Sequence, residues 1–231
     1  MRTLGRRSLA SFVDFPVTRF GGKSRLTGQK GRSTKRPLHP MTPDIAHDMV
    51  KLEALLRGHV APHLRAKAEA RILDLACGRC DEAETLIKVV KDEMDADQVK
   101  LVGADIRIRE VRQARERTAN LDTEFLIEDA TKLGAHKEMK DFDMVFLRHQ
   151  NYWHGPELWK KIFDTGLAKM NDDGLMVITS YFDREHQLAL DALQKLGAEV
   201  VLSKRNDASR DVGDAPGKSV DRWLAVLKKP K

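Results

Sequence analysis

The chain has 231 residues, of which 41% are hydrophobic and 33% charged, and its formal net charge is +6. This composition is typical of a globular protein with one sizeable α/β core, and two cysteines are too few for a disulfide framework. No apolar run approaches the roughly 18 residues of a membrane-spanning helix, and the N-terminus lacks the apolar core of a signal peptide. We therefore expect one main domain in a cytoplasmic protein with no membrane span.

The positive charge is concentrated in residues 1–40, which contain ten Arg or Lys residues and one acidic residue. This segment carries +9, so −3 remains for the rest of a chain whose total is +6. It is rich in Gly and shows little apolar periodicity, which predicts a disordered basic tail. Three alternatives remain: an arm that contacts RNA, an organelle-targeting peptide, or an untranslated segment that precedes a start at Met41.

The folded domain is expected to span residues 42–231 and to begin with a helical lead-in. In "MTPDIAHDMVKLEALL", Thr42 suits the N-cap position and Pro43 the first helical position. Apolar residues follow at helical spacing: Ile45, Met49, Leu52 and Leu56. The pattern predicts an amphipathic helix that continues, or is followed by another, through residue 68.

From residue 70 onward, short apolar runs alternate with longer amphipathic stretches, as in a parallel sheet with helices on its faces. Strands are expected near residues 71–75, 99–104, 123–127, 142–147, 174–181, 197–204 and 220–227. Helices are expected near residues 81–94, 108–119, 156–170 and 183–196, with a short helical stretch near 131–140. The polar loop 205–219 offers no crossover helix, so we predict that the last strand is antiparallel to its neighbours.

The loop after the first strand, within "ILDLACGRCDEAETL", contains both cysteines, Cys77 and Cys80, at C-x-x-C spacing. A thioredoxin-type redox pair is disfavoured because that family places a cis-proline downstream, and this chain has no proline from His63 through Gly155. A zinc site is disfavoured because it needs about four ligands and no second close pair of Cys or His is present. We therefore predict no metal site, and a loop of small residues that approaches a cofactor at a helix N-terminus.

A dinucleotide is the first cofactor to consider, and its loop requires the pattern G-x-G-x-x-G. If Gly78 is the second glycine, Ala76 takes the first position and Asp81 the third. A carboxylate at Asp81 would repel a pyrophosphate, which disfavours a nicotinamide-dependent oxidoreductase. S-adenosylmethionine has no phosphate and carries a sulfonium and an ammonium against one carboxylate, so acidic residues near the loop suit it.

The segment "LDLACGRCDE" resembles the first motif of the class I S-adenosylmethionine-dependent methyltransferases. Asp74, Ala76, Gly78 and Cys80 stand on its pattern positions, with Ala76 and Cys80 in place of two of the usual glycines. Both replacements are small, so the backbone can still approach a cofactor. The resemblance implies that Asp74, Ala76 and Gly78 contact S-adenosylmethionine.

Two further motifs follow on successive strands and extend the resemblance. "LVGADI" ends the second strand at Asp105, which the resemblance identifies as the acceptor of hydrogen bonds from both ribose hydroxyls. "FLIEDATKL" is similar to the adenine-binding segment, where Asp129 would accept from the exocyclic amine and the Ala130 backbone would meet the ring. Three motifs in the right order are more specific than any one of them.

The fourth strand continues as "FLRHQNYWHGPELW", where the resemblance places contacts to the methyl acceptor. His149 or His154 is the candidate general base, because an imidazole titrates near neutrality. The candidate substrate contacts are Arg148, Asn151, Tyr152 and Trp153. Local packing of these side chains is the competing interpretation. The absence of a D/N/S-P-P-aromatic motif here lowers the case for methylation of a nucleic-acid base.

The resemblance implies a Rossmann-like methyltransferase fold of the α/β class, a three-layer αβα sandwich around a mostly parallel seven-stranded sheet. The implied strand order is 3-2-1-4-5-7-6 with an antiparallel last strand. The implied reaction is methyl transfer from S-adenosyl-L-methionine to an unidentified acceptor, with a small molecule slightly favoured over RNA or protein. The alternative is a non-catalytic module that binds RNA or a partner protein and draws affinity from residues 1–40.

Overall fold

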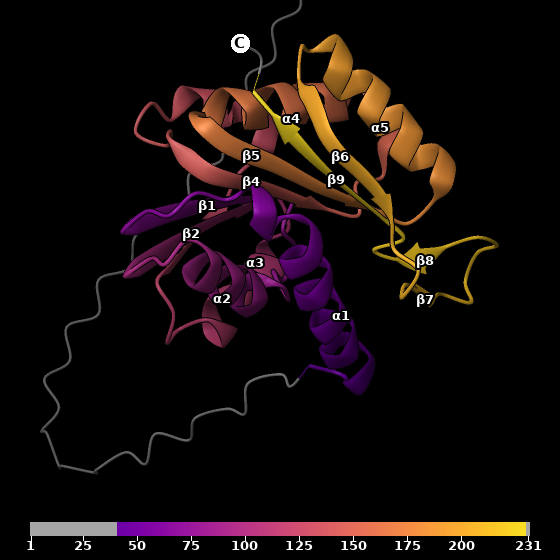
Figure 1. Cartoon of the computed structure of the whole chain (residues 1–231), viewed down its shortest axis with the longest axis horizontal. Coiled ribbons are helices and arrows are strands. Elements are labelled where there is room, and N and C mark those ends of the chain that lie inside the picture. The colour runs from indigo at the N-terminus through magenta and orange to yellow at the C-terminus, as the bar shows by residue number, and fades with distance from the viewer. Residues whose placement is uncertain (1–40, 230–231) are drawn as a thin grey trace, which may run out of the picture. The chain divides into compact units, whose positions relative to one another are not determined.

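Seven strands form one sheet in the order β3-β2-β1-β4-β5-β9-β6 (Figure 1). The computed structural model describes residues 41–229. The strands of the sheet are β1 (Glu69–Leu75), β2 (Gln98–Asp105), β3 (Thr123–Ile127), β4 (Phe142–Arg148), β5 (Met170–Ser180), β6 (Glu199–Arg205) and β9 (Trp223–Lys228). The first five pair in parallel, and β9 is antiparallel to β5 and β6. Since β9 is the seventh strand of this sheet, the predicted order and the antiparallel last strand are confirmed.

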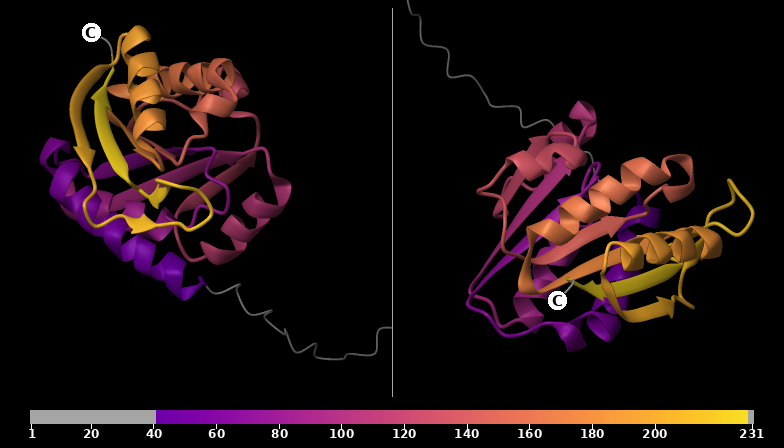
Figure 2. Two further views of the ribbon diagram at one scale, coloured as in Figure 1. Left: turned by 90° about the vertical axis from the view of Figure 1, so that its right-hand side faces the viewer. Right: turned by 90° about the horizontal axis from the view of Figure 1, so that it is seen from above.

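Helices cover both faces of the sheet (Figures 1 and 2). One face carries α1 (Pro43–His59), α2 (Ala83–Glu93) and α3 (Ile108–Arg117), and the other carries α4 (Pro156–Lys169) and α5 (Asp183–Lys195). Each face buries its own apolar cluster, because the strands are apolar on both sides: Ile72 and Leu101 face the first cluster, and Leu73 and Val102 the second. The predicted three-layer αβα arrangement is therefore confirmed.

Several boundaries differ from the predicted ones by about two residues, the 3-10 helix Ala130–Ala135 ends before the predicted residue 140, and two strands differ in a way that affects the sheet. β5 begins at Met170 rather than near residue 174, because Met170 is buried and pairs with Phe142 before the strand bulges out through two exposed aspartates. The predicted last strand, 220–227, is split: β8 (Ser219–Val220) pairs with β7 (Arg210–Asp211) in a separate small sheet, and β9 begins at Trp223. Asp221 separates the two strands with a φ of 50°, which no continuous strand tolerates.

The lead-in helix begins as predicted, since the Oγ1 atom of Thr42 accepts a hydrogen bond from the Ile45 N–H at 3.4 Å. It ends at His59 and is followed by a single 3-10 turn, Ala61–His63. One buried face of α1 carries Asp48, which accepts two hydrogen bonds from the Arg210 guanidinium of β7, at 2.9 and 2.6 Å. This ion pair connects the small β7–β8 sheet to the first helix of the domain.

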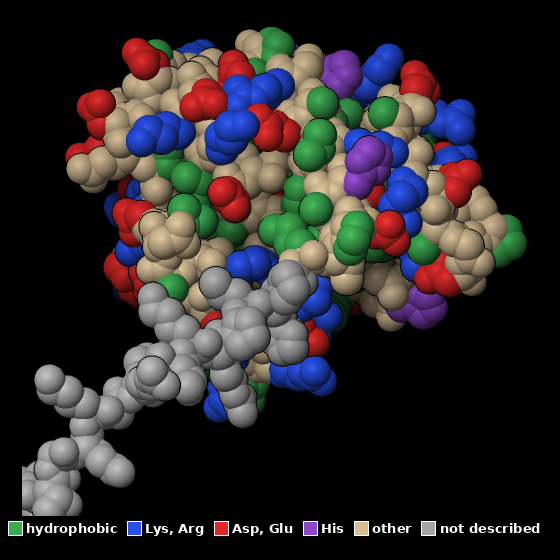
Figure 3. Space-filling view, turned by 90° about the horizontal axis from the view of Figure 1, so that it is seen from below, with side chains coloured by type: hydrophobic (Ala, Val, Ile, Leu, Met, Phe, Trp, Pro, Cys, Tyr) green, Lys and Arg blue, Asp and Glu red, His purple; other side chains and the backbone are tan. Residues whose placement is uncertain are grey.

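Charges of both signs are interspersed on the molecular face shown in Figure 3. On that side of the sheet, for example, Arg57 of α1 binds Asp92 and Glu93 of α2. Where Figure 3 shows side chains of described residues, positive and negative charges alternate over this face. Within residues 41–229, no helix has both the length and the apolar content needed to cross a bilayer. The tail prediction concerns residues 1–40, which lie outside the described residues.

Glu185 of α5 provides a pH-dependent test of the packing. It is 1% exposed, its Oε2 atom lacks a hydrogen-bond partner within residues 41–229, and burial raises its pKa to about 7. The folded protein therefore binds a proton that the unfolded chain releases near pH 4.5, so stability falls as pH rises from 4.5 to 7. We expect Glu185→Gln to raise the unfolding free energy at pH 8 by about 1–3 kcal/mol, and to have little effect at pH 5. Thermal unfolding at both pH values measures this, with the exposed Glu199→Gln as control; equal effects of Glu185→Gln at both would contradict it.

Candidate functional site

Two adjoining cavities open at the carboxyl ends of the parallel strands, where open α/β sheets bind ligands. The larger cavity has a volume of about 700 Å³ and the smaller one about 360 Å³; Ala76, Arg107 and Trp159 line both. The larger cavity is also lined by Cys77, Gly78, Arg79, Glu82, Arg109, Glu110, Gln113, Arg148, His149, Asn151 and Tyr181. The smaller cavity is also lined by Ala104, Asp105, Ile106, Glu128, Asp129, Ala130, Leu158 and Ile162.

The loop after β1 has an unusual backbone. Ala76, Gly78 and Cys80 all have positive φ angles, of 55°, 56° and 48°. This is the left-handed region that favours glycine, so the loop keeps the conformation of a three-glycine motif although two glycines have been replaced. The guanidinium of Arg117, on α3, holds the loop by donating to the carbonyl oxygens of Arg79 and Cys80.

A buried acidic cluster lies directly beneath this loop. Asp74 is fully buried; its Oδ2 atom accepts a hydrogen bond from the Cys80 thiol at 3.0 Å, and its Oδ1 atom has no partner among the described residues. One ligand atom from each of Asp74, Cys80 and Glu82 lies within 4.8 Å of the others. Burial and the neighbouring Glu82 raise the pKa of Asp74, and burial also raises the pKa of Glu82 against the opposing effect of Arg148. A cation bound beside this cluster would stabilise its ionised form.

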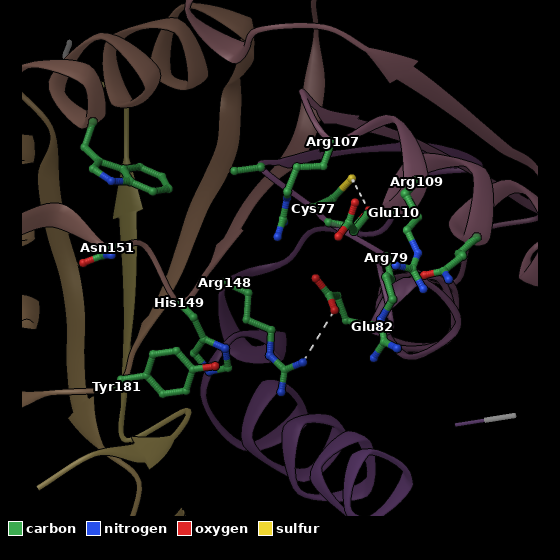
Figure 4. A pocket seen from close by; sticks show the side chains of 14 residues that line it. Cys77, Arg79, Glu82, Arg107, Arg109, Glu110, Arg148, His149, Asn151 and Tyr181 are labelled. Atoms are coloured by element: carbon green, nitrogen blue, oxygen red, sulfur yellow. Dashed lines mark hydrogen bonds and ion pairs between the residues drawn. The ribbon is translucent and has the colours of Figure 1, made fainter. Parts of the chain in front are cut away.

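Arg148 and His149 lie in the larger cavity beside Glu82 (Figure 4), and both contact the buried carboxylate of Asp221. The Arg148 guanidinium donates twice to the Asp221 carboxylate, at 3.0 and 2.6 Å, and lies 3.5 Å from Glu82. Burial would raise the pKa of Asp221, but Arg148 and then His149 hold it well below the usual range. Burial lowers the pKa of His149, with partial compensation by Asp221. These directions favour a neutral His149 imidazole at pH 7 beside an ionised Asp221 carboxylate.

The smaller cavity combines apolar and acidic groups. Ile106 and Leu158 are 68% and 50% exposed, unusual for large apolar side chains outside a binding site. Asp129 caps the 3-10 helix Ala130–Ala135, since its Oδ1 atom accepts from the N–H and the hydroxyl of Thr131. A flat ring system fits between such apolar side chains, with the second oxygen of Asp129 as a hydrogen-bond acceptor.

Asp105, the candidate ribose ligand, already has several donors. Its Oδ2 atom accepts from the Gly78 N–H at 2.8 Å and from Arg107 Nη2 at 3.0 Å, while its Oδ1 atom accepts from the N–H and Nε of Arg107. The Arg107 side chain is 55% exposed, and its Nη2 atom lies over Gly78, 2.7 Å from the position of an added Cβ. A ribose can reach both carboxylate oxygens only after this guanidinium moves.

We expect Arg107→Ala to tighten binding of S-adenosylmethionine by up to about tenfold, because freeing a charge-assisted pair restores about 1–1.5 kcal/mol. Calorimetry measures this, with Arg109→Ala as control because Arg109 lines the same cavity without bonding to Asp105. Weaker binding by Arg107→Ala would instead make Arg107 a direct ligand.

The structure separates the acceptor-side residues singled out from the sequence. Arg148, His149 and Asn151 line the larger cavity. Tyr152 is buried and stacks on Phe163, Trp153 packs against Phe182, and His154 is exposed and bonds Asn151 at 2.6 Å. These three residues line neither cavity, so we do not retain them as site residues. Asp74 also lines neither cavity, and it could act on a ligand only through its neighbour Glu82, which lines the larger one.

Several site residues were not singled out from the sequence. Glu82, Arg107 and Tyr181 line the larger cavity, although none of them is a candidate site residue of the sequence analysis. Tyr181 in fact stacks on His149 with ring centroids 3.8 Å apart. Asp221 lies 72 residues from His149, and no local pattern marks it.

The strand order and the double cavity define a Rossmann-like methyltransferase fold with a ligand site at its carboxyl edge. Residues 66–217 match the family model described as "Methyltransferase domain", and the chain belongs to this family. Membership in the class I S-adenosylmethionine-dependent methyltransferases, expected from the sequence, is confirmed.

Solved structures share the fold at low sequence identity. The TehB-like SAM-dependent methyltransferase of Corynebacterium glutamicum is 16% identical with a TM-score of 0.53, over 80% of this chain and 87% of that one. The N-methyltransferase NodS of Bradyrhizobium japonicum is 14% identical with a TM-score of 0.56, over 81% and 97%. An rRNA methylase of Streptococcus thermophilus is 15% identical with a TM-score of 0.52, over 86% and 99%. No curated protein matches the chain.

Proposed function

We propose that this enzyme transfers a methyl group from S-adenosylmethionine to a small-molecule acceptor bound in the larger cavity, with His149 as the general base. The observation that carries the proposal is the pair of cavities that meet at Ala76 and Arg107. The smaller cavity is apolar with Asp105 and Asp129 at its rim, which suits a nucleoside. The larger cavity contains the carboxyl group of Glu82 and the imidazole of His149.

The residues present fit S-adenosylmethionine. Ile106 and the Ala130 backbone would pack against the adenine ring, and Asp129 would accept from its amine. Asp105 would hold the ribose once the Arg107 side chain has moved. Gly78 leaves room above the loop for close approach, because only an exposed side chain lies where a Cβ would point.

Buried charge supports this cofactor more directly. If Asp74, Glu82 and Asp221 are all ionised, their three negative charges face one positive charge, that of Arg148. The buried cluster beside the larger cavity then has a net charge of −2. Buried charges without partners are costly, so a bound cation stabilises the ionised cluster. When bound, S-adenosylmethionine supplies a methyl group activated by a sulfonium. Its ammonium group would complement Glu82, which lines the larger cavity, and the buried Asp74 behind it.

The small-molecule acceptor is favoured by charge. Residues 41–231 carry −3, which opposes binding of a polyanion such as RNA to the folded domain. The solved structures similar to this chain include an N-methyltransferase and an rRNA methylase, so the shared fold does not select the acceptor. A cytoplasmic location is part of this proposal.

The decisive experiment is a transfer screen with methyl-labelled S-adenosylmethionine across small-molecule, protein and RNA fractions. We expect label in the small-molecule fraction, and none with Asp105→Ala. Label that appears only in RNA would overturn the acceptor proposal. An absence of cofactor binding by calorimetry, or unchanged binding by Asp105→Ala, would overturn the cofactor assignment.

A second candidate function is contact with RNA through residues 1–40, favoured by their charge of +9. This contact would be salt-sensitive, because binding releases counterions from the phosphates. Removing residues 1–40 should abolish it if it exists. If the full chain binds no RNA in low salt, this candidate fails.

A further inference from the structure

We propose that Arg107 and Arg109 form a binding site for an oxyanion of the acceptor, and that the cofactor's ribose makes this site available by displacing Arg107 from Asp105. This inference rests on the proposed function, because it requires a nucleoside at Asp105. The acceptor is then a small molecule that carries a carboxylate or a phosphate group in addition to the atom that is methylated.

Basic side chains predominate among the charged residues that line the larger cavity. Four arginines line it together with two glutamates: Arg79, Arg107, Arg109 and Arg148, with Glu82 and Glu110. Arg148 is already held by Asp221 at 2.6 Å. Arg79 is held by Asp81 at 2.7 Å. Arg109 is exposed and has no carboxylate at ion-pair distance among residues 41–229. The cavity therefore offers a guanidinium to an anionic ligand.

Arg107 connects this cavity to the expected ribose position. Among the arginines that the structure describes, only Arg107 lines both cavities. Its Nε and Nη2 atoms donate to the two carboxylate oxygens of Asp105, at 2.9 and 3.0 Å. Asp105 is 4% exposed, so ribose hydroxyls can approach its oxygens only from the cavity side, where the guanidinium lies. The guanidinium and a ribose therefore exclude each other at Asp105.

The displaced guanidinium stays beside the larger cavity, because the Arg107 backbone is fixed. Its N–H donates to Asp105 Oδ1 at 2.8 Å, and its carbonyl oxygen accepts from the Val111 N–H of α3 at 3.1 Å. The side chain is 55% exposed and extends into the cavity (Figure 4), so rotation about its own bonds is enough to free it. Glu110 also attracts Arg107, but solvent weakens this partly exposed pair. A bound oxyanion can instead accept two parallel N–H bonds from the guanidinium.

Arg109 has a different part in the same site. It lies in the first turn of α3 and lines the larger cavity but not the smaller one. Its charge is therefore present with and without a nucleoside, and it contributes a constant part of the anion's affinity. The contribution of Arg107 depends on the nucleoside, so Arg107 is the residue that couples the two ligands.

The size of this coupling follows from the Arg107–Asp105 pair. The tenfold gain expected for Arg107→Ala means that Arg107 occupies Asp105 in about nine of ten free molecules. Each ligand that needs the displaced guanidinium then strengthens binding of the other by up to about tenfold. The two enhancements must be equal, because coupling between two binding equilibria is a single free energy.

The test is calorimetric titration of the full chain with inorganic phosphate and, separately, with acetate, at constant ionic strength. Each titration is done with and without saturating 5′-methylthioadenosine, which contains ribose and adenine but no charged group. We expect this nucleoside to strengthen binding of at least one anion by about five- to tenfold, and the anion that gains identifies the group on the acceptor. Adenine, which has no ribose, is the control ligand and should give no enhancement.

Two variants separate the roles of the arginines. In Arg107→Ala the enhancement by 5′-methylthioadenosine should disappear. In Arg109→Ala the anion should bind more weakly by the same factor with and without the nucleoside, so that the enhancement itself is retained. Both side chains are exposed, so neither substitution removes a buried contact.

Equal anion affinity with and without bound 5′-methylthioadenosine would overturn the inference, as would an enhancement that persists in Arg107→Ala. Weaker binding of S-adenosylmethionine by Arg107→Ala would assign Arg107 to the cofactor itself and overturn it too. Because nucleoside binding is measured separately, the two failures are distinguishable. A protein that binds the nucleoside without coupling refutes only the anion site, whereas one that binds neither 5′-methylthioadenosine nor S-adenosylmethionine refutes the proposed function as well.

Discussion

Gly78→Val should weaken binding of S-adenosylmethionine by about 100-fold or more, which corresponds to about 2.8 kcal/mol. Gly78 has a φ of 56°, and a β-branched side chain is strongly disfavoured there. An added Cβ would also lie 2.7 Å from the Arg107 guanidinium, over the surface where a cofactor must approach. Calorimetry measures the affinity, and circular dichroism establishes that the variant folds.

Cys77→Ser is the control for this prediction. Cys77 is 8% exposed, and its thiol makes only a long contact of 3.8 Å to the Gly78 carbonyl. We expect affinity to change by less than about threefold, since little interaction energy is lost. If Cys77→Ser abolished binding while Gly78→Val did not, the thiol pair would be functional and the redox interpretation would return.

Glu82→Gln should reduce cofactor affinity by about tenfold or more and remove most of its dependence on pH. In the free protein burial raises the pKa values of Asp74 and Glu82, so this pair holds a proton to higher pH than exposed carboxyl groups do. A cation that binds there lowers both pKa values, so the proton leaves on binding. The affinity for S-adenosylmethionine should therefore keep rising at pH values above those at which exposed carboxyl groups titrate. The rise should stop once Asp74 and Glu82 are already ionised in the free protein.

Calorimetry in buffers of different ionisation enthalpy counts the released protons. We expect a net release on binding to the unaltered protein and almost none with Glu82→Gln. Glu110→Gln is the matched control, because Glu110 lines the same cavity and lies outside the buried cluster. Proton release that persists in Glu82→Gln would show that another group titrates.

Local pattern was sufficient to place the candidate cofactor residues at one edge of the sheet, whereas their roles came from the family resemblance. Asp74, Asp105 and Asp129 each lie within two residues of the end of a strand, and parallel strands bring their carboxyl ends to one edge. Strand positions followed from apolar runs, whereas the strand order came from the family resemblance. The left-handed angles of Ala76 and Cys80 were implicit in the motif, since they replace glycines there.

The acceptor half could not be predicted in the same way. Asp221 lies within the range predicted as the last strand. Its contacts are with Thr179 and His149, which come 42 and 72 positions earlier in the chain. Neighbours of His149 in sequence, Tyr152 and Trp153, were attractive candidates because they are aromatic, yet they pack against α4 and the start of α5. Contacts that depend on tertiary packing leave no periodic signal in the sequence.

The position of β9 between β5 and β6 has a consequence for the edge of the sheet. In the part of the chain that the structure describes, β6 pairs with β9 alone, and β9 in turn pairs with β5. A chain truncated before Trp223 would therefore leave β5 as an exposed edge strand and β6 without a partner. Because an unpaired edge offers free N–H and C=O groups to another chain, such a truncated protein should aggregate rather than fold.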